Sequence, residues 1–140
     1  MRDYYDGISF ATTITGKKMH LFLARYIADY DVTPEQWSVL NVIQLQGPLT
    51  QKKIAELVEK DTPTVNRIIE VLLRKELVRR ELSETDRRKT FLSVTEKGDT
   101  EVAALRPVVE KACAHMFAGL NEEQLEQYMT LLSHITKNIE

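Results

Sequence analysis

Hydrophobic and polar residues alternate in two short segments in the middle of the chain, residues 78–82 and 90–94. Alternation that includes β-branched and aromatic residues is typical of a strand with one buried face. The seven residues between the two segments are polar, and they include a Thr-Asp pair that favours a turn. The pattern therefore predicts a β-hairpin whose turn carries three adjacent cations, Arg87, Arg88 and Lys89.

The segment before the hairpin predicts two short helices joined by a tight turn. Thr50 is suited to cap the first helix, and Thr62 followed by Pro63 to begin the second, because Thr is a favoured N-cap and Pro a favoured first helical residue. On the second helix Arg67 and Arg74 point away from the apolar face at about 100° per residue. The predicted apolar faces are Ile54, Leu57 and Val58 on the first helix, and Val65, Ile68, Ile69, Leu72 and Leu73 on the second. Two helices and a basic hairpin in this order predict a winged helix-turn-helix, whose second helix suits the major groove of DNA.

Helical spacing of apolar residues also predicts helices on both sides of this unit. The first covers residues 8 to about 30 and is apolar over more than one face, which indicates that other helices surround it. The next begins at the capping sequence Thr33-Pro34-Glu35-Gln36 and ends at Gly47-Pro48. After Gly98 a long amphipathic segment leads to a last helix that Asn121 caps. The predicted fold is mainly α with a small β-hairpin wing.

Several short motifs in the middle of the chain together resemble the signature of the MarR family of bacterial transcriptional regulators. They are Thr64-x-x-Arg67, Leu72, Glu76-Leu77-Val78, Asp86-Arg87-Arg88 and Thr95-x-x-Gly98. The motifs span about 35 residues, and the order of the predicted elements extends the resemblance over nearly the whole chain. Two positions depart from the pattern: Glu76 stands where many members carry Gly, and Val65 where Leu, Ile, Ala or Met is usual.

The terminal helices carry more apolar surface than a winged helix of about 65 residues can bury. Leaving that surface in water costs about 25 cal/mol per Å². A two-fold dimer with interleaved terminal helices would cover it, and the pattern alone favours this about as much as a thicker monomeric core. The resemblance implies the dimer. We therefore expect residues 1–32 and 99–140 to form a helical dimerisation region and residues 33–98 the winged helix-turn-helix DNA-binding domain.

Composition is compatible with this interpretation. The chain has 140 residues, 43% of them hydrophobic and 29% charged, which is typical of a globular domain. Its net charge of −2 appears unfavourable for DNA binding, but the charge is unevenly spread. Residues 47–98 hold 12 Lys and Arg against 9 Asp and Glu, and the remainder holds 7 against 12. Because salt screens charges beyond about 8–10 Å, the local basic character matters more than the total.

The sequence indicates the cytoplasm rather than a membrane or a secreted location. No apolar run approaches the roughly 18 residues that span a bilayer, and the N-terminus lacks the apolar core of a signal peptide. A single cysteine, Cys113, fits a reducing compartment, and its place on an apolar stripe favours an inert thiol. We expect a cytoplasmic protein.

We expect no catalysis, metal site or cofactor. The three histidines, His20, His115 and His134, are scattered, and neither a nucleophile motif nor a glycine-rich phosphate loop is present. His115 and His134 could meet in the helical region, although isolated histidines on helices are usually surface or core residues.

DNA contacts can be assigned to named residues. Arg67 is the best candidate for reading a base edge, ideally guanine O6 and N7. The resemblance implies that Asp86 orients Arg88 for the minor groove, and narrow A·T-rich grooves attract such a guanidinium. For Arg79 and Arg80, an ion pair that supports the fold is as plausible as a DNA contact. The predicted DNA-binding set is Thr50, Gln51, Thr62, Pro63, Thr64, Asn66, Arg67, Asp86, Arg87, Arg88 and Lys89.

The resulting prediction is a homodimeric regulator, most simply a repressor, that binds a pseudo-palindromic operator in double-stranded DNA. The resemblance further implies release from DNA by a small aromatic or phenolic effector. Four residues could line its site, and each would serve equally well as ordinary core: His20, Phe22, Tyr26 and Trp37. The alternatives from other classes are a ligand- or metal-sensing protein with an incidental hairpin and a helical protein-interaction module whose winged helix does not read DNA.

Overall fold

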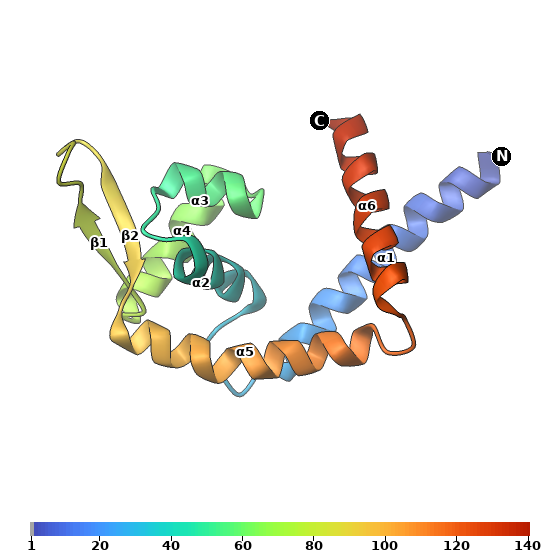
Figure 1. Cartoon of the computed structure of the whole chain (residues 1–140), viewed down its shortest axis with the longest axis horizontal. Coiled ribbons are helices and arrows are strands. Elements are labelled where there is room, and N and C mark those ends of the chain that lie inside the picture. Colours follow the sequence, from blue (N-terminus) through green and yellow to red (C-terminus); the bar gives the residue numbers. More distant parts are fainter. Residues whose placement is uncertain (1) are drawn as a thin grey trace.

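The computed structural model describes residues 2–140 and the side chains from Tyr4 onward, so Met1, the first residue of the predicted 1–32 region, lies outside the described residues. Within this range the chain forms six helices and one antiparallel pair of strands (Figure 1). In order they are α1 (Arg2–Tyr26), α2 (Pro34–Gln46), α3 (Gln51–Val58), α4 (Thr62–Arg74), β1 (Val78–Leu82), β2 (Thr90–Val94), α5 (Glu96–Met116) and α6 (Glu122–Ile139). The predicted mainly α fold with a β-hairpin wing is confirmed.

The first helix was predicted with the wrong bounds. α1 begins at Arg2 instead of residue 8, and it ends at Tyr26 instead of about residue 30. Its threonines do not break it, because the hydroxyls of Thr12 and Thr13 donate to the carbonyl oxygens four residues earlier, at 2.8 and 3.1 Å. After Tyr26 the chain turns toward α2 and buries the side chain of Ile27.

The hairpin has the bounds that the alternation predicts. Val78 pairs with Val94 and Leu82 with Thr90 in an antiparallel register. Leu92, at the centre of β2, also exchanges two backbone hydrogen bonds with Leu49, at 2.7 and 3.0 Å. The linker between α2 and α3 thus holds the wing against the helices.

One core joins the helix-turn-helix to the hairpin. Leu40 of α2, Ile54 of α3, Ile69 of α4 and Leu92 of β2 are at most 1% exposed. The same cluster takes in Ile27, which follows α1, and Val102 and Leu105 of α5. The core therefore crosses both of the domain boundaries that the sequence suggested.

The predicted apolar face of α3 was partly wrong. Leu57 is 36% exposed, whereas Ala55 is buried together with Ile54. At 100° per residue, Leu57 lies about 100° from the centre of the face formed by Ile54, Ala55 and Val58. Leu57 consequently lies at the edge of the core.

The junction between α4, the wing and α5 explains two motif positions. A Cβ at Gly98 would overlap the carbonyl oxygen of Leu77, so the close packing of α5 against this turn requires glycine. The Thr95 hydroxyl donates to the carbonyl oxygen of Glu76 at 2.6 Å and accepts the Gly98 N–H at 3.0 Å. Glu76 itself has a φ of 60°, in the left-handed region that favours glycine, the residue found at this position in many members of the family that the motifs resemble.

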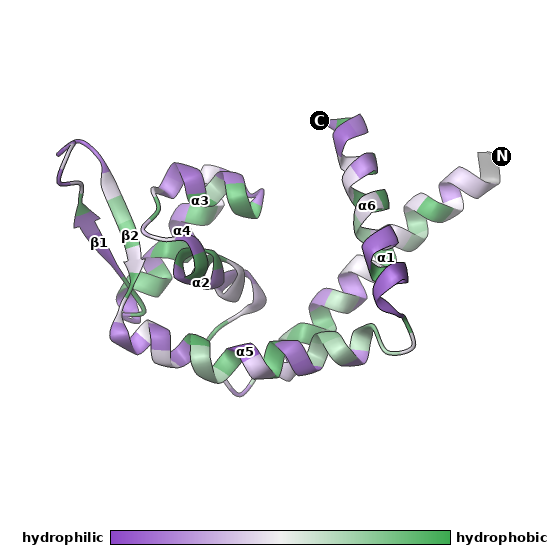
Figure 2. Cartoon of the chain, in the orientation of Figure 1, coloured by the Kyte–Doolittle hydropathy of each residue, from purple (hydrophilic) through white to green (hydrophobic). Residues whose placement is uncertain are grey.

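We call residues 33–98 the winged-helix lobe, and α1, α6 and the C-terminal half of α5 the helical arm. Figure 1 shows α5 running from the wing to the arm, where α1 and α6 diverge. Hydrophobic residues occur along both diverging helices (Figure 2). α6 buries none of its residues, although Asn121 starts it with a capping box.

Candidate nucleic-acid interface

Asp61, and not the predicted Thr62, caps α4. The Asp61 carboxylate accepts the Thr64 N–H at 2.9 Å and the Thr64 hydroxyl at 2.8 Å. These hydrogen bonds from Thr64, with the nearby positive charge of Arg67, lower the pKa of Asp61. Thr62 and Pro63 become the first two residues of the helix, and both are exposed. Both Asp and Thr are good N-caps, and a Pro is accepted in the first turn after either of them.

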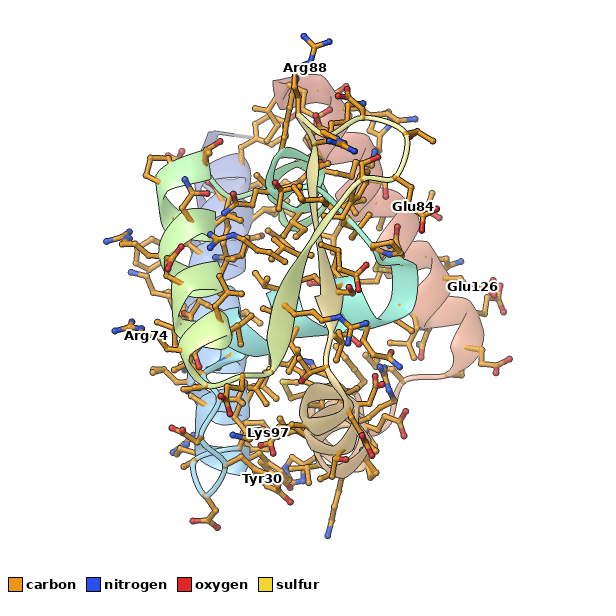
Figure 3. The ribbon with its side chains drawn as sticks, turned by 90° about the vertical axis from the view of Figure 1, so that its left-hand side faces the viewer. Tyr30, Arg74, Glu84, Arg88, Lys97 and Glu126 are labelled. Atoms are coloured by element: carbon orange, nitrogen blue, oxygen red, sulfur yellow. The ribbon has the colours of Figure 1, made fainter. Side chains whose placement is uncertain are left out.

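The exposed face of α4 presents the predicted polar set. Val65, Ile68, Ile69 and Leu72 are buried, so Asn66 and Arg67 face outward. An Arg67 guanidinium nitrogen lies 3.4 Å from the Thr64 hydroxyl oxygen, to which it donates. Asp61, Thr64 and Arg67 therefore form a short chain of polar contacts that biases the guanidinium toward the N-terminal end of the helix. Arg74, at the other end of α4, points away from the body of the protein (Figure 3).

The N-termini of α3 and α4 differ in charge. The Thr50 hydroxyl accepts the Lys53 N–H at 3.1 Å, which caps α3 with a neutral group. α4 instead begins with the Asp61 carboxylate, which would repel a phosphate. Both helix starts belong to the predicted DNA-binding set, and for a phosphate the electrostatics favour the one at Thr50 and Gln51 over the one at Thr62.

The turn of the wing is ordered by its own hydrogen bonds. The Ser83 hydroxyl oxygen accepts the Asp86 N–H at 3.2 Å, and the Asp86 carbonyl oxygen accepts the Lys89 N–H at 3.0 Å. The Asp86 carboxylate accepts the Arg88 N–H at 3.0 Å and lies 3.7 Å from the Arg88 Nε. The Arg88 side chain is nevertheless 95% exposed and projects from the tip of the hairpin (Figure 3). Asp86 thus combines the two roles considered for it, shaping the turn and lying beside Arg88.

Two arginines of the wing, Arg79 and Arg80, form ion pairs. Arg80 of β1 and Glu70 of α4 are 2.8 Å apart, and this pair links the hairpin to the helix. Within β1, Arg79 lies 2.8 Å from Glu81. The hydrogen bond from Arg79 lowers the pKa of Glu81. The structure therefore shows Arg79 and Arg80 in ion pairs that support the fold.

The four predicted effector-site residues do not form one site. His20 lies 3.1 Å from the Glu35 carboxylate, and Trp37 is 6% exposed in the lobe core with the Arg106 guanidinium 5.6 Å from its ring centroid. Tyr26 packs against Phe22, with ring centroids 4.9 Å apart. Of the four, only Phe22 lines the cavity between α1, α6 and the C-terminal end of α5.

This cavity has a volume of about 730 Å³. Its lining includes the aromatic rings of Phe22, Phe117, Tyr128 and His115 and the positively charged side chains of Lys18 and Arg25. His115 stacks on Phe22 with ring centroids 5.1 Å apart. Sequence reasoning missed His115 and Tyr128, because no pattern along the chain indicates that the end of α5 and the start of α6 lie beside the middle of α1.

The other candidate chemistry is dispersed. Among the described residues, no three His, Cys, Asp or Glu side chains are placed to hold a metal ion. Cys113 is partly buried on α5, while His134 lies on α6, away from the stack of His115 on Phe22. No helix that the structure describes is long and apolar enough to cross a membrane.

Comparison with known proteins relates these features to a family. The model of the MarR family matches residues 30–89. The uncharacterized HTH-type transcriptional regulator YwaE of Bacillus subtilis strain 168 is 26% identical over 137 residues, which cover 96% of this chain and 80% of that protein. A Listeria innocua Clip11262 protein of unknown function is 56% identical, with a TM-score of 0.75 over 100% of this chain and 98% of that one.

Two solved structures connect the fold with DNA and with a small molecule. MepR of S. aureus, solved as a complex with DNA, is 25% identical, with a TM-score of 0.82 over 93% of this chain and 96% of that one. BpsR of Bordetella bronchiseptica, whose DNA binding is regulated by 6-hydroxynicotinic acid, shares the fold at 23% identity, with a TM-score of 0.84 and 92% of each chain covered.

Proposed function

The chain belongs to the MarR family of DNA-binding transcriptional regulators, and on this premise we propose that it acts as a homodimeric repressor that a small molecule releases from a pseudo-palindromic operator. Members of this family regulate transcription and are not enzymes. We infer that the protein acts where its DNA target lies, in the cytoplasm. The observation that carries the proposal is the exposure of both Arg67 on α4 and Arg88 on the wing of one lobe, together with an arm whose apolar surface is uncovered.

The two basic elements suit the two grooves of one duplex. α4 is exposed along the face that carries Asn66 and Arg67, and an exposed helix face with a guanidinium fits the major groove. The wing projects Arg88, which is nearly fully exposed and has Asp86 beside it, toward an adjacent minor groove. Arg87 and Lys89 lie in the same turn and would contact phosphates. The ion pair of Arg80 with Glu70 keeps the two elements at a fixed separation.

The uncovered arm supports the dimer. Among the described residues, fifteen large hydrophobic side chains are exposed. Eleven of them lie on α1 or α6, and a twelfth is Leu120, just before α6. α6 buries no residue in one chain, so its apolar positions need a partner to leave water. A second copy would cover them by two-fold pairing, because the same surface is then used on both sides. Such a dimer would place two α4 helices about 34 Å apart on successive major grooves.

The effector belongs in the cavity of the arm. Phe22, Phe117 and Tyr128 offer aromatic surface, and Lys18 and Arg25 offer positive charge, which suits an aromatic or phenolic compound with an acidic group. The cavity adjoins the surface that the partner chain would cover, so an occupant would favour one arrangement of the two chains over another. The regulation of BpsR by 6-hydroxynicotinic acid supports this class of ligand.

The proposal is tested by selecting binding sites from random DNA duplexes with the full-length protein. We expect a motif with two inverted half-sites centred one helical turn apart, bound by two copies of the chain. Sedimentation of the protein alone at micromolar concentration should give a dimer. A stable monomer, or enrichment of single half-sites only, would contradict the proposal that the protein binds DNA as a dimer.

The effector is tested by adding small aromatic acids and phenols to the protein bound to its selected duplex. We expect at least one to release the DNA, and Phe22→Ala to require a higher concentration of it. Leu45→Ala, a change of an exposed residue on α2 far from the cavity lining, is the control and should leave the release unchanged. Release that is equally sensitive in Phe22→Ala would place the effector elsewhere.

A further inference from the structure

A contact between α3 and α4 involves two amide side chains on the surface that would face DNA. Gln51, the first residue of α3, is partly buried, and Asn66, on α4, is exposed. The Gln51 Nε2 donates to the Asn66 Oδ1 at 3.2 Å. The backbone of Gln51 is ordered, since this residue directly follows the Thr50 cap at the start of α3. We propose that Gln51 is a positioning residue that orients Asn66 to read an adenine in the major groove.

The hydrogen-bonding capacity of Asn66 supports this assignment, which rests on the proposed function. A carbonyl oxygen has two lone pairs, and Gln51 occupies one of those on Asn66 Oδ1. The second lone pair and both N–H groups of Nδ2 remain available. Adenine presents a donor at N6 beside an acceptor at N7, and an Asn amide matches this pair with two hydrogen bonds.

The neighbouring residue makes a separate contact. Arg67 donates to the Thr64 hydroxyl on its own helix, whereas Asn66 is held by a residue of α3. Successive helical residues differ in direction by about 100°, so the two side chains reach different base pairs. Arg67 suits guanine and Asn66 suits adenine, and the proposal is that the half-site contains both bases.

A side chain that is already oriented also discriminates between bases more strongly than a side chain that is free to rotate. An unrestrained Asn must lose rotational freedom when it binds a base, and it can turn its amide to offer donors or acceptors to other base pairs. The hydrogen bond from Gln51 fixes which atom is the acceptor before DNA arrives. Removing Gln51 should therefore weaken the preference for adenine, while a phosphate contact by Gln51 would lower affinity equally for all sequences.

The experiment selects binding sites from random duplexes with the wild-type protein, and then compares Asn66→Ala, Gln51→Ala and the double variant on the selected duplex. Each A·T pair of the half-site is exchanged for the other three pairs in turn. We expect Asn66→Ala to lose the preference at one A·T pair by on the order of tenfold. Gln51→Ala should weaken the preference at that same pair, and the double variant should match Asn66→Ala, because the two residues act as one unit.

A modified base and a matched control sharpen the result. Replacing that adenine by 7-deazaadenine removes N7, and it should weaken wild-type binding but leave Asn66→Ala unaffected. Lys52→Ala, an exposed change next to Gln51, should lower affinity equally for every duplex. Thermal melting of each variant checks that the substitutions leave the fold intact.

The outcomes separate the two proposals. A wild-type protein that enriches no motif contradicts the proposed function. A wild-type motif that Asn66→Ala reproduces at every position contradicts the role of Asn66 and leaves the proposed function standing. A uniform loss of affinity in Gln51→Ala, with all base preferences kept, contradicts the positioning role of Gln51.

Discussion

The winged-helix lobe and the helical arm are both built mainly from helices, yet the lobe buries its apolar residues within one chain and α6 of the arm buries none. α4 is only 13 residues long, and it buries Val65, Ile68, Ile69 and Leu72. α6 has 18 residues and a capping box, and it buries none. The difference shows that local helix signals specify an element but do not say which molecule supplies its packing partner. The predictions below test this contrast, beginning with the largest expected effect.

The first prediction concerns the uncovered face of α6. Leu131→Asp places a charge where the partner would pack, and two-fold symmetry introduces it twice. We expect the dimer to weaken by roughly 10²- to 10⁴-fold, from the lost burial of two leucines alone. Sedimentation over a range of protein concentrations measures this.

Leu45→Asp is the matched control, because Leu45 lies in the lobe and is 62% exposed, as is Leu131. Its dimer should have wild-type strength. If both substitutions weakened the dimer equally, the exposed leucines of the lobe and the arm would contribute equally to dimerisation. This result would contradict the proposal that the arm forms the dimer interface.

The second prediction concerns the buried core of the lobe. Leu40 is fully buried on α2, and Leu40→Ala should lower the free energy of unfolding by about 2–5 kcal/mol. Denaturant titration should give the same loss at every protein concentration, because the cavity forms within one chain. Leu131→Ala should instead destabilise the protein by an amount that varies with protein concentration. A concentration-dependent loss in Leu40→Ala would place part of the lobe core between chains.

The third prediction compares cations of the two regions. Arg87 lies in the wing and Lys111 on α5, and both are exposed. Arg87→Ala removes one phosphate contact from each chain of the dimer, so it should reduce the slope of log affinity for DNA against log salt by about 1.8, at about 0.9 per contact. Lys111→Ala should leave the slope unchanged. Equal slopes for wild type and Arg87→Ala would remove Arg87 from the interface.

The smallest effect concerns the cap of α4. Hydrogen bonds from Thr64 lower the pKa of Asp61 in the folded protein, so its contribution to stability is present above the unfolded pKa and is lost as the pH falls through the folded one. Asp61→Asn keeps an N-cap without a titrating group. Its stability should therefore fall less than that of the wild type between about pH 5 and pH 2. Parallel acid dependence in wild type and variant, measured by thermal melting, would contradict the role of the carboxylate.

Sequence reasoning succeeded where a local pattern determines the structure. The alternation predicted both strands with their observed bounds, 78–82 and 90–94, because it places Val78 and Leu92 on a buried face. It failed at the start of α4, where Asp61 and Thr62 are both acceptable caps and the choice depends on where the chain enters the helix.

The candidate sites show the same division. The polar residues on the exposed face of α4 could be predicted, because a helix with one buried face leaves the other exposed. The cavity lining could not, since Phe22 of α1 meets His115 and Tyr128 only after three helices have packed together. Trp37 and Phe22 are both aromatic residues of predicted helices, yet Trp37 lies in the lobe core and Phe22 lines the cavity.

α5 belongs to both regions, and this has a mechanical consequence. Val102 and Leu105 fix its first half in the lobe, while His115 and Met116 at its other end border the arm. Pro107 lies between Leu105 and His115 and removes one backbone hydrogen bond, which weakens the helix against bending there, while Val108 and Val109 after it still pack against the core. From there to the start of α5 is roughly 16 Å at 1.5 Å per residue, so a bend of about 10° would shift the wing by roughly 3 Å. A small rearrangement of the arm would therefore move the wing by a distance similar to the length of a hydrogen bond.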